Sequence, residues 1–299
     1  MFLLIILGYL LRWKNILNAE VARGINELVY SLFLPTLLFY NICEMKRQEA
    51  FDMKLAFFAI SSIIVIGISL TLIVPRFLHD RKQCGAMVHG CCRSNFIIFG
   101  LTVTVPLFGQ SSAGPMSLLV AMIVPVYSVI SVLVLEYFRK EKVEPVKLIR
   151  DIFKNPLIIA AIAGMPILLS GTRLALPVSD FLSSISSMAT PMAFILLGAD
   201  IRFHALKNHG KLLFWAVSGK LVIIPLIFIS AGIGFGFRGT ELGALMILFA
   251  APSAVATYAM ARKMDSDAIL AGEIVVFTSL FSVLSIFLWV IALKAAAVI

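Results

Sequence analysis

Three consecutive polar residues, Arg93, Ser94 and Asn95, interrupt an otherwise apolar stretch at residues 89–109. Hydrocarbon offers no water to such groups, so they must face other protein groups or a water-filled cavity. The planar guanidinium of an arginine fits a carboxylate, and neighbouring hydroxyl and amide groups can donate further hydrogen bonds. We therefore predict that this stretch is a broken helix that binds an anionic solute. The alternative is that Arg93 forms a structural pair with an acidic residue or a backbone carbonyl.

Two other basic residues lie within apolar stretches. His89 precedes Arg93 by four residues and so shares its helical face, where it could relay protons or simply line the mouth of a cavity. Lys220 could face the same cavity or extend its ammonium group to the membrane surface. No acidic residue lies as deep in an apolar segment, so the interior is positively charged and favours an anionic solute.

A second interruption follows at residues 250–256, where Pro252 and Ser253 stand among alanines. A proline cannot continue the hydrogen-bond ladder of a helix, and small neighbours let another backbone approach closely. We predict that Pro252 and Ser253 form the second half of the binding site, with the N-termini of the interrupted helices facing the anion. The simpler alternative is that Pro252 only kinks a helix and that Asn95 only joins helices.

The composition indicates an integral membrane protein. Of the 299 residues, 61% are hydrophobic and only 14% are charged, against about 25% charged in soluble domains. The net charge of +9 is explained by basic residues in cytoplasmic loops, so we expect no nucleic-acid partner. The four cysteines show no metal-ligand spacing, and we predict buried free thiols and no metal site.

We predict an all-α integral membrane protein with about ten transmembrane helices. The first segment is short for a span, so either it crosses part of the bilayer or the chain begins downstream of its natural start. A polar linker at 139–154 separates a first set of five segments (1–138) from a second (155–299). The segments lie at 1–11, 25–43, 55–75, 86–108, 115–138, 155–170, 179–200, 212–237, 241–261 and 268–294.

Basic residues gather in the loops after the odd-numbered segments. Because such residues are enriched on the cytoplasmic side, we predict that the 139–154 linker is cytoplasmic and that both termini lie outside. The predicted location is the cell (inner) membrane, which the chain crosses several times. The fourth and ninth segments then enter from opposite sides, and both interruptions lie near the middle of the bilayer.

The two halves resemble each other at a nearly constant offset. An offset of 156 residues places Gly8 on Gly164 and Pro35 on Pro191, and an offset of 154 aligns residues 127–133 with 281–287. Since each half has an odd number of segments, the second copy must be inverted in the membrane. Inverted repeats with interrupted helices at matching positions are typical of secondary transporters, whose sites lie near the midplane.

Motifs of soluble enzymes and of ATP-driven pumps do not occur. The chain has no G-x-x-x-x-G-K-[ST] phosphate loop, no H-E-x-x-H and no G-x-S-x-G. We therefore expect no enzymatic activity, no cofactor and no ATP-driven transport by this chain alone. Coupling to a proton or a sodium gradient stays open.

The sequence resembles the auxin efflux carrier family, within the bile acid/auxin transporter group. The resemblance covers nearly the whole chain, and the short linker is similar to that of bacterial members. Its motifs are L-G-Y-L-L-R at 7–12, L-V-Y-S-L-F-L-P-T-L-L-F at 28–39, R-S-N-F-I-I-F-G-L at 93–101, N-P-L-I-I-A at 155–160 and P-S-A-V-A-T-Y at 252–258.

The resemblance implies ten helices in two inverted five-helix repeats, divided into a scaffold and a transport domain. It also implies that the fourth and ninth helices cross at their unwound centres, here at Asn95 and at Pro252 with Ser253. Family substrates are organic anions: auxin in plant members and dicarboxylates in bacterial ones. Plant carriers have an asparagine in each crossing helix, whereas this chain has Ala251 and Ser253 near the second crossing.

Together these observations predict a secondary transporter, working as an exporter, of small organic anions such as carboxylates or dicarboxylates. Alternating access would move the crossing helices against a scaffold of segments one, two, six and seven. The expected partners are the solute and the lipid bilayer, and a homodimer stays open. Two alternatives remain, an organic-anion channel with the same cationic pore and a membrane sensor that binds without transport.

Overall fold

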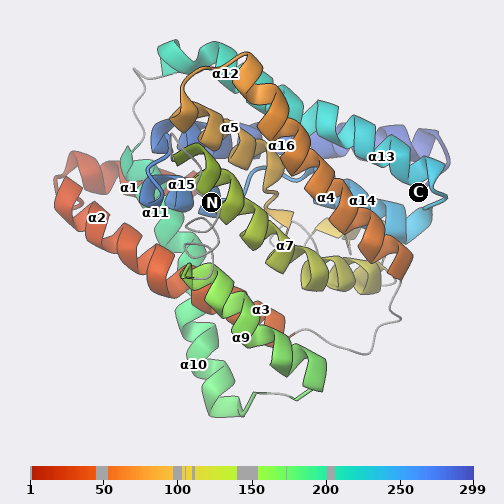
Figure 1. Cartoon of the computed structure of the whole chain (residues 1–299), viewed down its shortest axis with the longest axis horizontal. Helices are drawn as coiled ribbons and strands as arrows, with labels where there is room; N and C mark the ends of the chain where they lie inside the picture. The colour runs from red at the N-terminus through yellow and green to blue at the C-terminus, as the bar shows by residue number, and fades with distance from the viewer. Residues whose placement is uncertain are drawn as a thin grey trace.

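The computed structural model is helical throughout the part of the chain that it describes (Figure 1). It describes residues 2–44, 53–96, 103–104, 106–109, 112–139, 154–172, 174–200 and 206–299. Within these ranges the only strand-like pairing is an isolated bridge between two residues. The predicted linker at 139–154 lies outside the described residues except at its ends, and so does the fourth segment between 97 and 102.

Most predicted apolar segments contain one or more helices. In chain order the helices are α1 (Phe2–Trp13), α2 (Ala19–Leu28), η1 (Val29–Phe33), α3 (Leu34–Cys43), α4 (Met53–Ile73), η2 (Val74–Arg76), α5 (Arg81–Cys92), α7 (Ala113–Arg139), α9 (Pro156–Ser170), α10 (Leu176–Ser187), α11 (Ala189–Asp200), α12 (Leu206–Ser218), η4 (Gly219–Ile223), α13 (Ile224–Gly234), α14 (Gly239–Ala250), α15 (Ala256–Lys263) and α16 (Ala268–Ala295).

Six helical stretches of the described residues are long and apolar enough to cross a membrane. Three shorter apolar helices accompany them, at Leu3–Trp13, Pro156–Leu168 and Gly239–Ala250. These lengths and compositions agree with a protein that crosses the membrane several times. The count of ten spans and the inverted repeat stay predictions.

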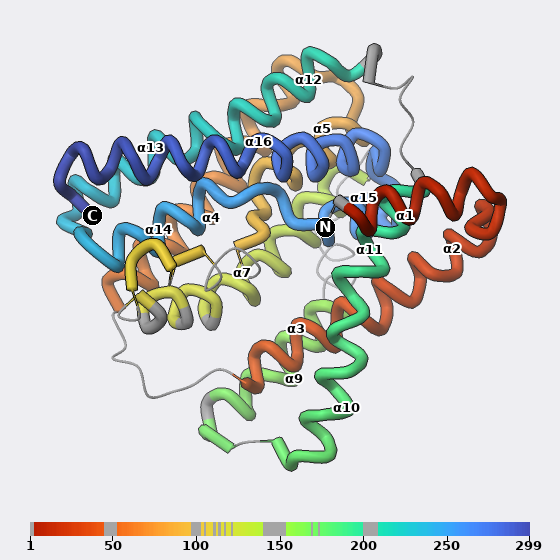
Figure 2. Tube along the Cα trace, turned by 180° about the vertical axis from the view of Figure 1, so that it is seen from behind, coloured from red at the N-terminus to blue at the C-terminus, as the bar shows by residue number. Residues whose placement is uncertain are grey.

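The helices form two groups that lie side by side in opposite views (Figures 1 and 2). The first helix group consists of α1, α2, η1, α3, α9, α10 and α11. The second consists of α4, η2, α5, α7, α12, η4, α13, α14, α15 and α16. Each group contains helices from before and after the linker at 139–154. The two groups are therefore not the two halves of the sequence.

Glycines allow very close helix packing in the first helix group. A Cβ atom added to Gly8 would lie 2.0 Å from the backbone oxygen of Ile195, and one added to Gly198 would lie 2.0 Å from that of Ile5. The backbones of α1 and α11 therefore touch at two levels. Small residues serve this purpose in membrane helices, where dispersion contacts between backbones replace the hydrophobic effect.

Two continuous helices widen by one residue just before a proline. The π-helical turn Val29–Phe33 precedes Pro35, and the π-helical turn Gly219–Ile223 precedes Pro225. A proline has no N–H to donate and its ring collides with the preceding turn, and the wider turn accommodates both effects. Each helix therefore continues through its proline, but its side chains change register there.

The close contact at Gly8 gives a stability prediction. We expect Gly8→Ala to separate α1 from α11 and to cost about 1–3 kcal/mol, as overpacking typically does. Gly24→Ala is the matched control, because a Cβ atom there meets nothing within 4 Å and alanine favours a helix. Melting temperatures of the purified variants in detergent measure the effect. Equal melting of Gly8→Ala and the parent protein would contradict the packing described here.

Candidate functional site

Two helices break at the same place in the second helix group. α5 ends at Cys92 and α14 ends at Ala250, and the next residue of each is extended, with φ −81° and ψ 112° at Arg93 and φ −62° and ψ 148° at Ala251. The two extended segments run antiparallel, with a bridge between Ser94 and Ser253. We call residues 93–95 and 251–255 the junction.

Backbone hydrogen bonds join the two sides of the junction. The Asn95 N–H donates to the Pro252 carbonyl at 2.7 Å, and the Ala254 N–H donates to the Arg93 carbonyl at 3.2 Å. The Ser94 hydroxyl adds a bond to the Ala251 carbonyl at 3.3 Å. Breaking a helix leaves backbone groups without partners, and here each broken helix supplies partners to the other.

The serine of the second break is held by its neighbours. The Ser253 hydroxyl donates to the Gly90 carbonyl at 2.5 Å, and its N–H donates to the Thr278 hydroxyl on α16 at 3.1 Å. Ser253 is fully buried and does not line the cavity described below. Pro252 is also absent from the cavity wall and contributes its carbonyl to the junction. Both predicted site residues therefore hold the junction together.

A cavity of about 150 Å³ lies beside the junction, between the two helix groups. The second group supplies the junction and α7, and the first group supplies α3, α9 and α11. Its walls are mainly apolar, with a few polar groups from both helix groups. The lining residues are Leu34, Leu37, Leu38, Asn41, Arg93, Ser94, Asn95, Phe96, Val124, Tyr127, Leu157, Thr190, Ala254, Val255 and Ala256.

Arg93 is the one lysine or arginine among these lining residues, and none of them is acidic. Its Nη1 donates to the Ser131 hydroxyl at 3.0 Å and lies 3.4 Å from the sulfur of Met260. No carboxylate in the described part of the chain pairs with it. The guanidinium is therefore held in place by neutral groups, and the predicted alternative of an acidic structural partner does not apply among the described residues.

Two side-chain amides add polar groups to the same cavity. The Asn41 amide nitrogen is buried without a hydrogen-bond partner, and the Asn95 amide makes no side-chain hydrogen bond with the described residues. A buried amide that lacks a partner costs free energy. A bound solute or water that accepts from these groups would remove that cost.

The start of α15 also faces the cavity. Val255 caps this helix and Ala256 is its first residue, and both line the cavity wall. The first N–H groups of a helix carry a partial positive charge. At this end the Thr257 and Tyr258 N–H groups already donate to the Ala254 and Val255 carbonyls at 2.9 and 3.1 Å, which leaves the helix dipole as the attraction for an anion. An anion in the cavity would therefore meet this helix end together with Arg93.

The two other predicted cations lie away from the cavity wall. Lys220 is 1% exposed and packs within the η4 turn close to Cys91 and Cys92 of α5, so it does not extend to the membrane surface. His89 is also 1% exposed, and neither of its ring nitrogens has a hydrogen-bond partner. His89 therefore does not lie at the mouth of this cavity.

Three lining residues were missed or misjudged from sequence. Asn41 was not among the predicted site residues, although a lone amide in an apolar segment was a usable signal. Tyr127 and Thr190 gave no signal, because both residue types are common in apolar helices. Tyr127 packs edge-on against Phe96 with ring centroids 5.8 Å apart, which fixes one wall of the cavity.

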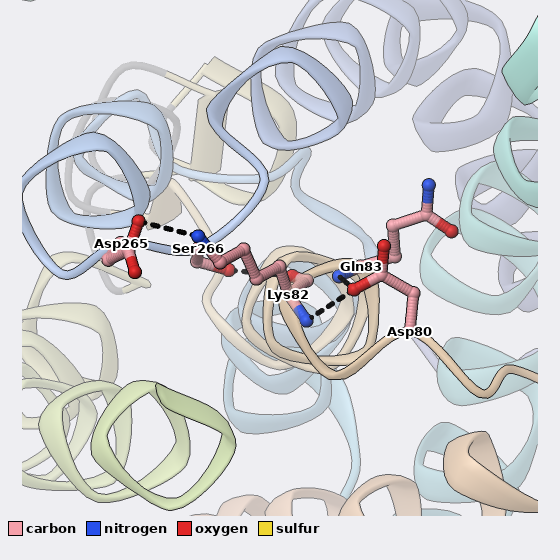
Figure 3. A network of polar contacts seen from close by, with 5 residues as sticks. All are labelled: Asp80, Lys82, Gln83, Asp265 and Ser266. Carbon is pink, nitrogen blue, oxygen red and sulfur yellow. Dashed lines mark hydrogen bonds and ion pairs between the residues drawn. The ribbon is translucent and has the colours of Figure 1, made fainter. Parts of the chain in front are cut away.

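A polar clasp joins the start of α5 to the residues that follow α15 (Figure 3). The Lys82 ammonium at the start of α5 pairs with the Asp265 carboxylate after α15 at 2.7 Å, and the Ser266 hydroxyl donates to the Lys82 carbonyl at 2.8 Å. Asp80 caps α5 by accepting from the Lys82 N–H at 2.8 Å. α5 and α15 are thus connected at the junction and again at their ends.

Comparisons with known proteins identify the family of this chain. A family model described as membrane transport protein matches residues 1–290. A protein of Methanothermobacter thermautotrophicus named as an uncharacterized transporter is 25% identical over 97% of this chain and 95% of its own length. Another of Methanocaldococcus jannaschii, with the same description, is 23% identical over 96% and 94%. The chain therefore belongs to the membrane transport protein family, which includes the auxin efflux carriers.

Proposed function

We propose that this protein is a secondary transporter of small organic anions, carboxylates or dicarboxylates, and that the cavity beside the junction is its binding site. The observation that carries the proposal is Arg93, an arginine without a described acidic partner at a cavity between two helix groups. A buried cation is costly in an apolar surrounding, and an anionic solute would offset that cost. The solute would therefore complete the electrostatics of the site.

Each wall of the cavity has a defined role in this proposal. The carboxylate would lie between the Arg93 guanidinium and the N-terminus of α15, and Asn41 and Asn95 would bond its remaining polar groups. The leucines of α3 would contact the carbon skeleton. Ser94, Pro252 and Ser253 would hold the junction, while Lys220 and His89 would act from outside the cavity.

Contacts between helices support the predicted inverted repeat. In the predicted repeat, α1 corresponds to α9 and α3 corresponds to α11. The contact between α1 and α11 should therefore recur between α9 and α3, and both pairs are packed in the structure. Gly8 and Gly164, which the offset of 156 aligns, both lie at these contacts, facing Ile195 and Ile42. This agreement favours ten spans in two inverted sets, with the junction near the middle of the membrane.

The two helix groups suggest how access would alternate. The Tyr258 hydroxyl on α15 donates to the Leu196 carbonyl on α11 at 3.3 Å, and Lys263 at the end of α15 pairs with Glu27 on α2. Both contacts join one group to the other beside α15. In the predicted orientation this is the cytoplasmic side, so the site would be closed to the cytoplasm in this structure. A channel would need a pathway open on both sides, which favours a carrier.

We also propose net export across the cell membrane, with both termini outside and the 139–154 linker in the cytoplasm. The distribution of basic residues supports the orientation. The chain carries no nucleotide-binding motif, and coupling of the flux to a proton or sodium gradient stays open.

The role of Arg93 gives the first functional prediction. With a labelled organic acid that the parent protein transports in proteoliposomes, we expect Arg93→Gln to raise KM at least about tenfold, because a hydrogen-bonded charge contributes about 1.5–3 kcal/mol. Arg93→Lys should be intermediate, since it keeps the charge but loses the planar fork. Arg23→Gln, at an exposed position of α2, is the control for net charge. An unchanged KM in folded Arg93→Gln would refute the anion site.

Asn41 gives a second prediction with a matched control on the same run of helices. We expect Asn41→Ala to raise KM about five- to tenfold, because the solute would lose one hydrogen bond. Asn26 is also buried and also has an amide atom without a partner, but it does not line the cavity. Asn26→Ala should therefore leave KM unchanged. If both variants change KM equally, Asn41 acts on folding and not on the solute.

The contact between Glu27 and Lys263 gives a third prediction. Exposed ion pairs contribute about 0.2–1 kcal/mol, so Glu27→Gln should shift the population toward a cytoplasm-open state by up to about fivefold. The measurement is the rate at which a membrane-impermeant maleimide labels Val255→Cys from the cytoplasmic side. Glu20→Gln, on the exposed surface of α2, is the control. Equal labelling rates in both variants would show that this pair does not hold the site closed.

A further inference from the structure

The cavity at the junction carries one positive charge and no negative charge among the described residues that line it. The positive charge belongs to Arg93, whose hydrogen bond to Ser131 and contact with Met260 involve neutral groups. One carboxylate of a solute would neutralise this guanidinium. A second carboxylate in the same cavity would stay uncompensated in apolar surroundings, which is costly. The charge of the cavity therefore matches a solute with a single carboxylate.

The other positive groups near the junction do not provide for a second carboxylate. Lys220 and His89 are each 1% exposed, and neither lines the cavity. The start of α15 does lie in the cavity wall, but its Thr257 and Tyr258 N–H groups already donate to backbone carbonyls. The dipole of this helix corresponds to only about half a charge. It can support the carboxylate at Arg93 but cannot replace a second cation.

The amides of the cavity need a neutral oxygen as their partner. The Asn41 amide nitrogen is a buried donor without a hydrogen-bond partner. Arg93 and Asn95 lie two residues apart in the extended segment, where alternate side chains point to the same side. An oxygen on the carbon next to the carboxylate would therefore lie close to an amide. A carbonyl oxygen fits better than a hydroxyl, because it only accepts and brings no proton that needs its own acceptor.

Much of the remaining wall is aliphatic. Leu34, Leu37 and Leu38 lie on one face of α3, at the spacing of three and four residues that joins neighbours on a helix, and Asn41 follows on the same face. Leu157 of α9 lines the cavity as well. A branched aliphatic group would bury its surface against these leucines. A polar group at that end of the solute would lose its hydration without gaining a partner.

The volume of the cavity limits the size of the solute. At about 150 Å³ it equals an engineered cavity that encloses a benzene molecule. A carboxylic acid of about four or five carbons is slightly larger than benzene and can place its carboxylate at the guanidinium. An acid that carries an aromatic ring in addition to its carboxylate is too large for this space.

We propose that the cavity selects short aliphatic oxo acids, with one carboxylate, an oxo group on the neighbouring carbon and a branched apolar end. This inference rests on the proposed function, because it takes the cavity as the transport site. The carboxylate lies at Arg93, the oxo group accepts from Asn41 or Asn95, and the apolar end contacts the leucines of α3. Dicarboxylates are rejected by their second charge, and aromatic acids by their size.

The stabilisation of the purified full chain in detergent by added acids tests the selection, since a ligand that binds the folded state raises the melting temperature according to its affinity. Ketoisovalerate has the predicted features. Succinate has the same number of non-hydrogen atoms but a second carboxylate, isovalerate lacks the oxo group, and phenylpyruvate adds an aromatic ring. We expect ketoisovalerate to bind at least about tenfold more tightly than succinate or phenylpyruvate, and about fivefold more tightly than isovalerate.

Two variants should change the selection in a defined direction. Leu38→Ala enlarges the cavity and should let phenylpyruvate bind about as tightly as ketoisovalerate. Leu245→Ala makes the same truncation at a buried position of α14 outside the cavity wall, and should keep the preference of the parent protein. Asn41→Leu keeps the size of the side chain but removes the amide, and should make the affinities for ketoisovalerate and isovalerate equal. A purely structural role of Asn41 would leave their ratio unchanged.

The role of Arg93 separates this inference from the proposed function. If succinate, isovalerate or phenylpyruvate binds the parent protein as tightly as ketoisovalerate, and Arg93→Gln abolishes that binding, the selection is overturned while the anion site stands. The selection is also overturned if Leu38→Ala and Leu245→Ala have the same effect on phenylpyruvate. If no acid stabilises the protein in a way that depends on Arg93, the anion site fails and the selection fails with it.

Discussion

The antiparallel backbone pairing at the junction is the constraint on which the rest of the structure depends. A helix broken inside a membrane exposes N–H and carbonyl groups that hydrocarbon cannot satisfy, and each costs several kcal/mol. The breaks after α5 and α14 solve this problem together, because Asn95 bonds to Pro252 and Ala254 bonds to Arg93. Neither break would be tolerated alone. The backbone pairing between the two breaks therefore fixes where α15 begins and where the cavity lies.

The same pairing explains which side chains are free to contact a solute. The Ser253 hydroxyl donates to the Gly90 carbonyl, so it supports the backbone and faces away from the cavity. Arg93 is held by Ser131, which in turn donates to the Tyr127 carbonyl at 2.5 Å. A cation held by neutral groups keeps its charge available. The proposed transport therefore depends on the positive charge of Arg93, which no carboxylate of the described residues neutralises.

The sequence was sufficient for the helical membrane class and for the position of both breaks. Arg93 to Asn95 are polar residues that a continuous apolar helix would not contain without a reason, so their types located the first break. Pro252 was distinguished by the small residues around it, because other helices of this chain continue through Pro35 and Pro225. Side-chain direction could not be predicted in the same way. An extended segment abandons the helical period, which is why Ser253 was expected in the binding site and is found turned toward Gly90.

Lys220 shows the same limit for a different reason. It lies in a π-helical turn, which adds a residue and shifts every later side chain around the helix axis. No spacing rule based on 3.6 residues per turn could place its ammonium next to Cys91 and Cys92. Asn41 could have been recognised, since it is a lone amide in an apolar helix. Its place in the cavity wall could not, because it depends on the packing of α7 and α9 against α3, which no local sequence pattern predicts.

The most direct test of the central claim is a crystal structure with a brominated carboxylic acid that competes for transport, located by the anomalous signal of bromine. The proposal predicts one bromine site in the cavity between the helix groups, with the carboxylate within hydrogen-bond distance of the Arg93 guanidinium and beside the start of α15. A bromine site elsewhere, with the cavity at the junction empty at a saturating concentration of the acid, would contradict it.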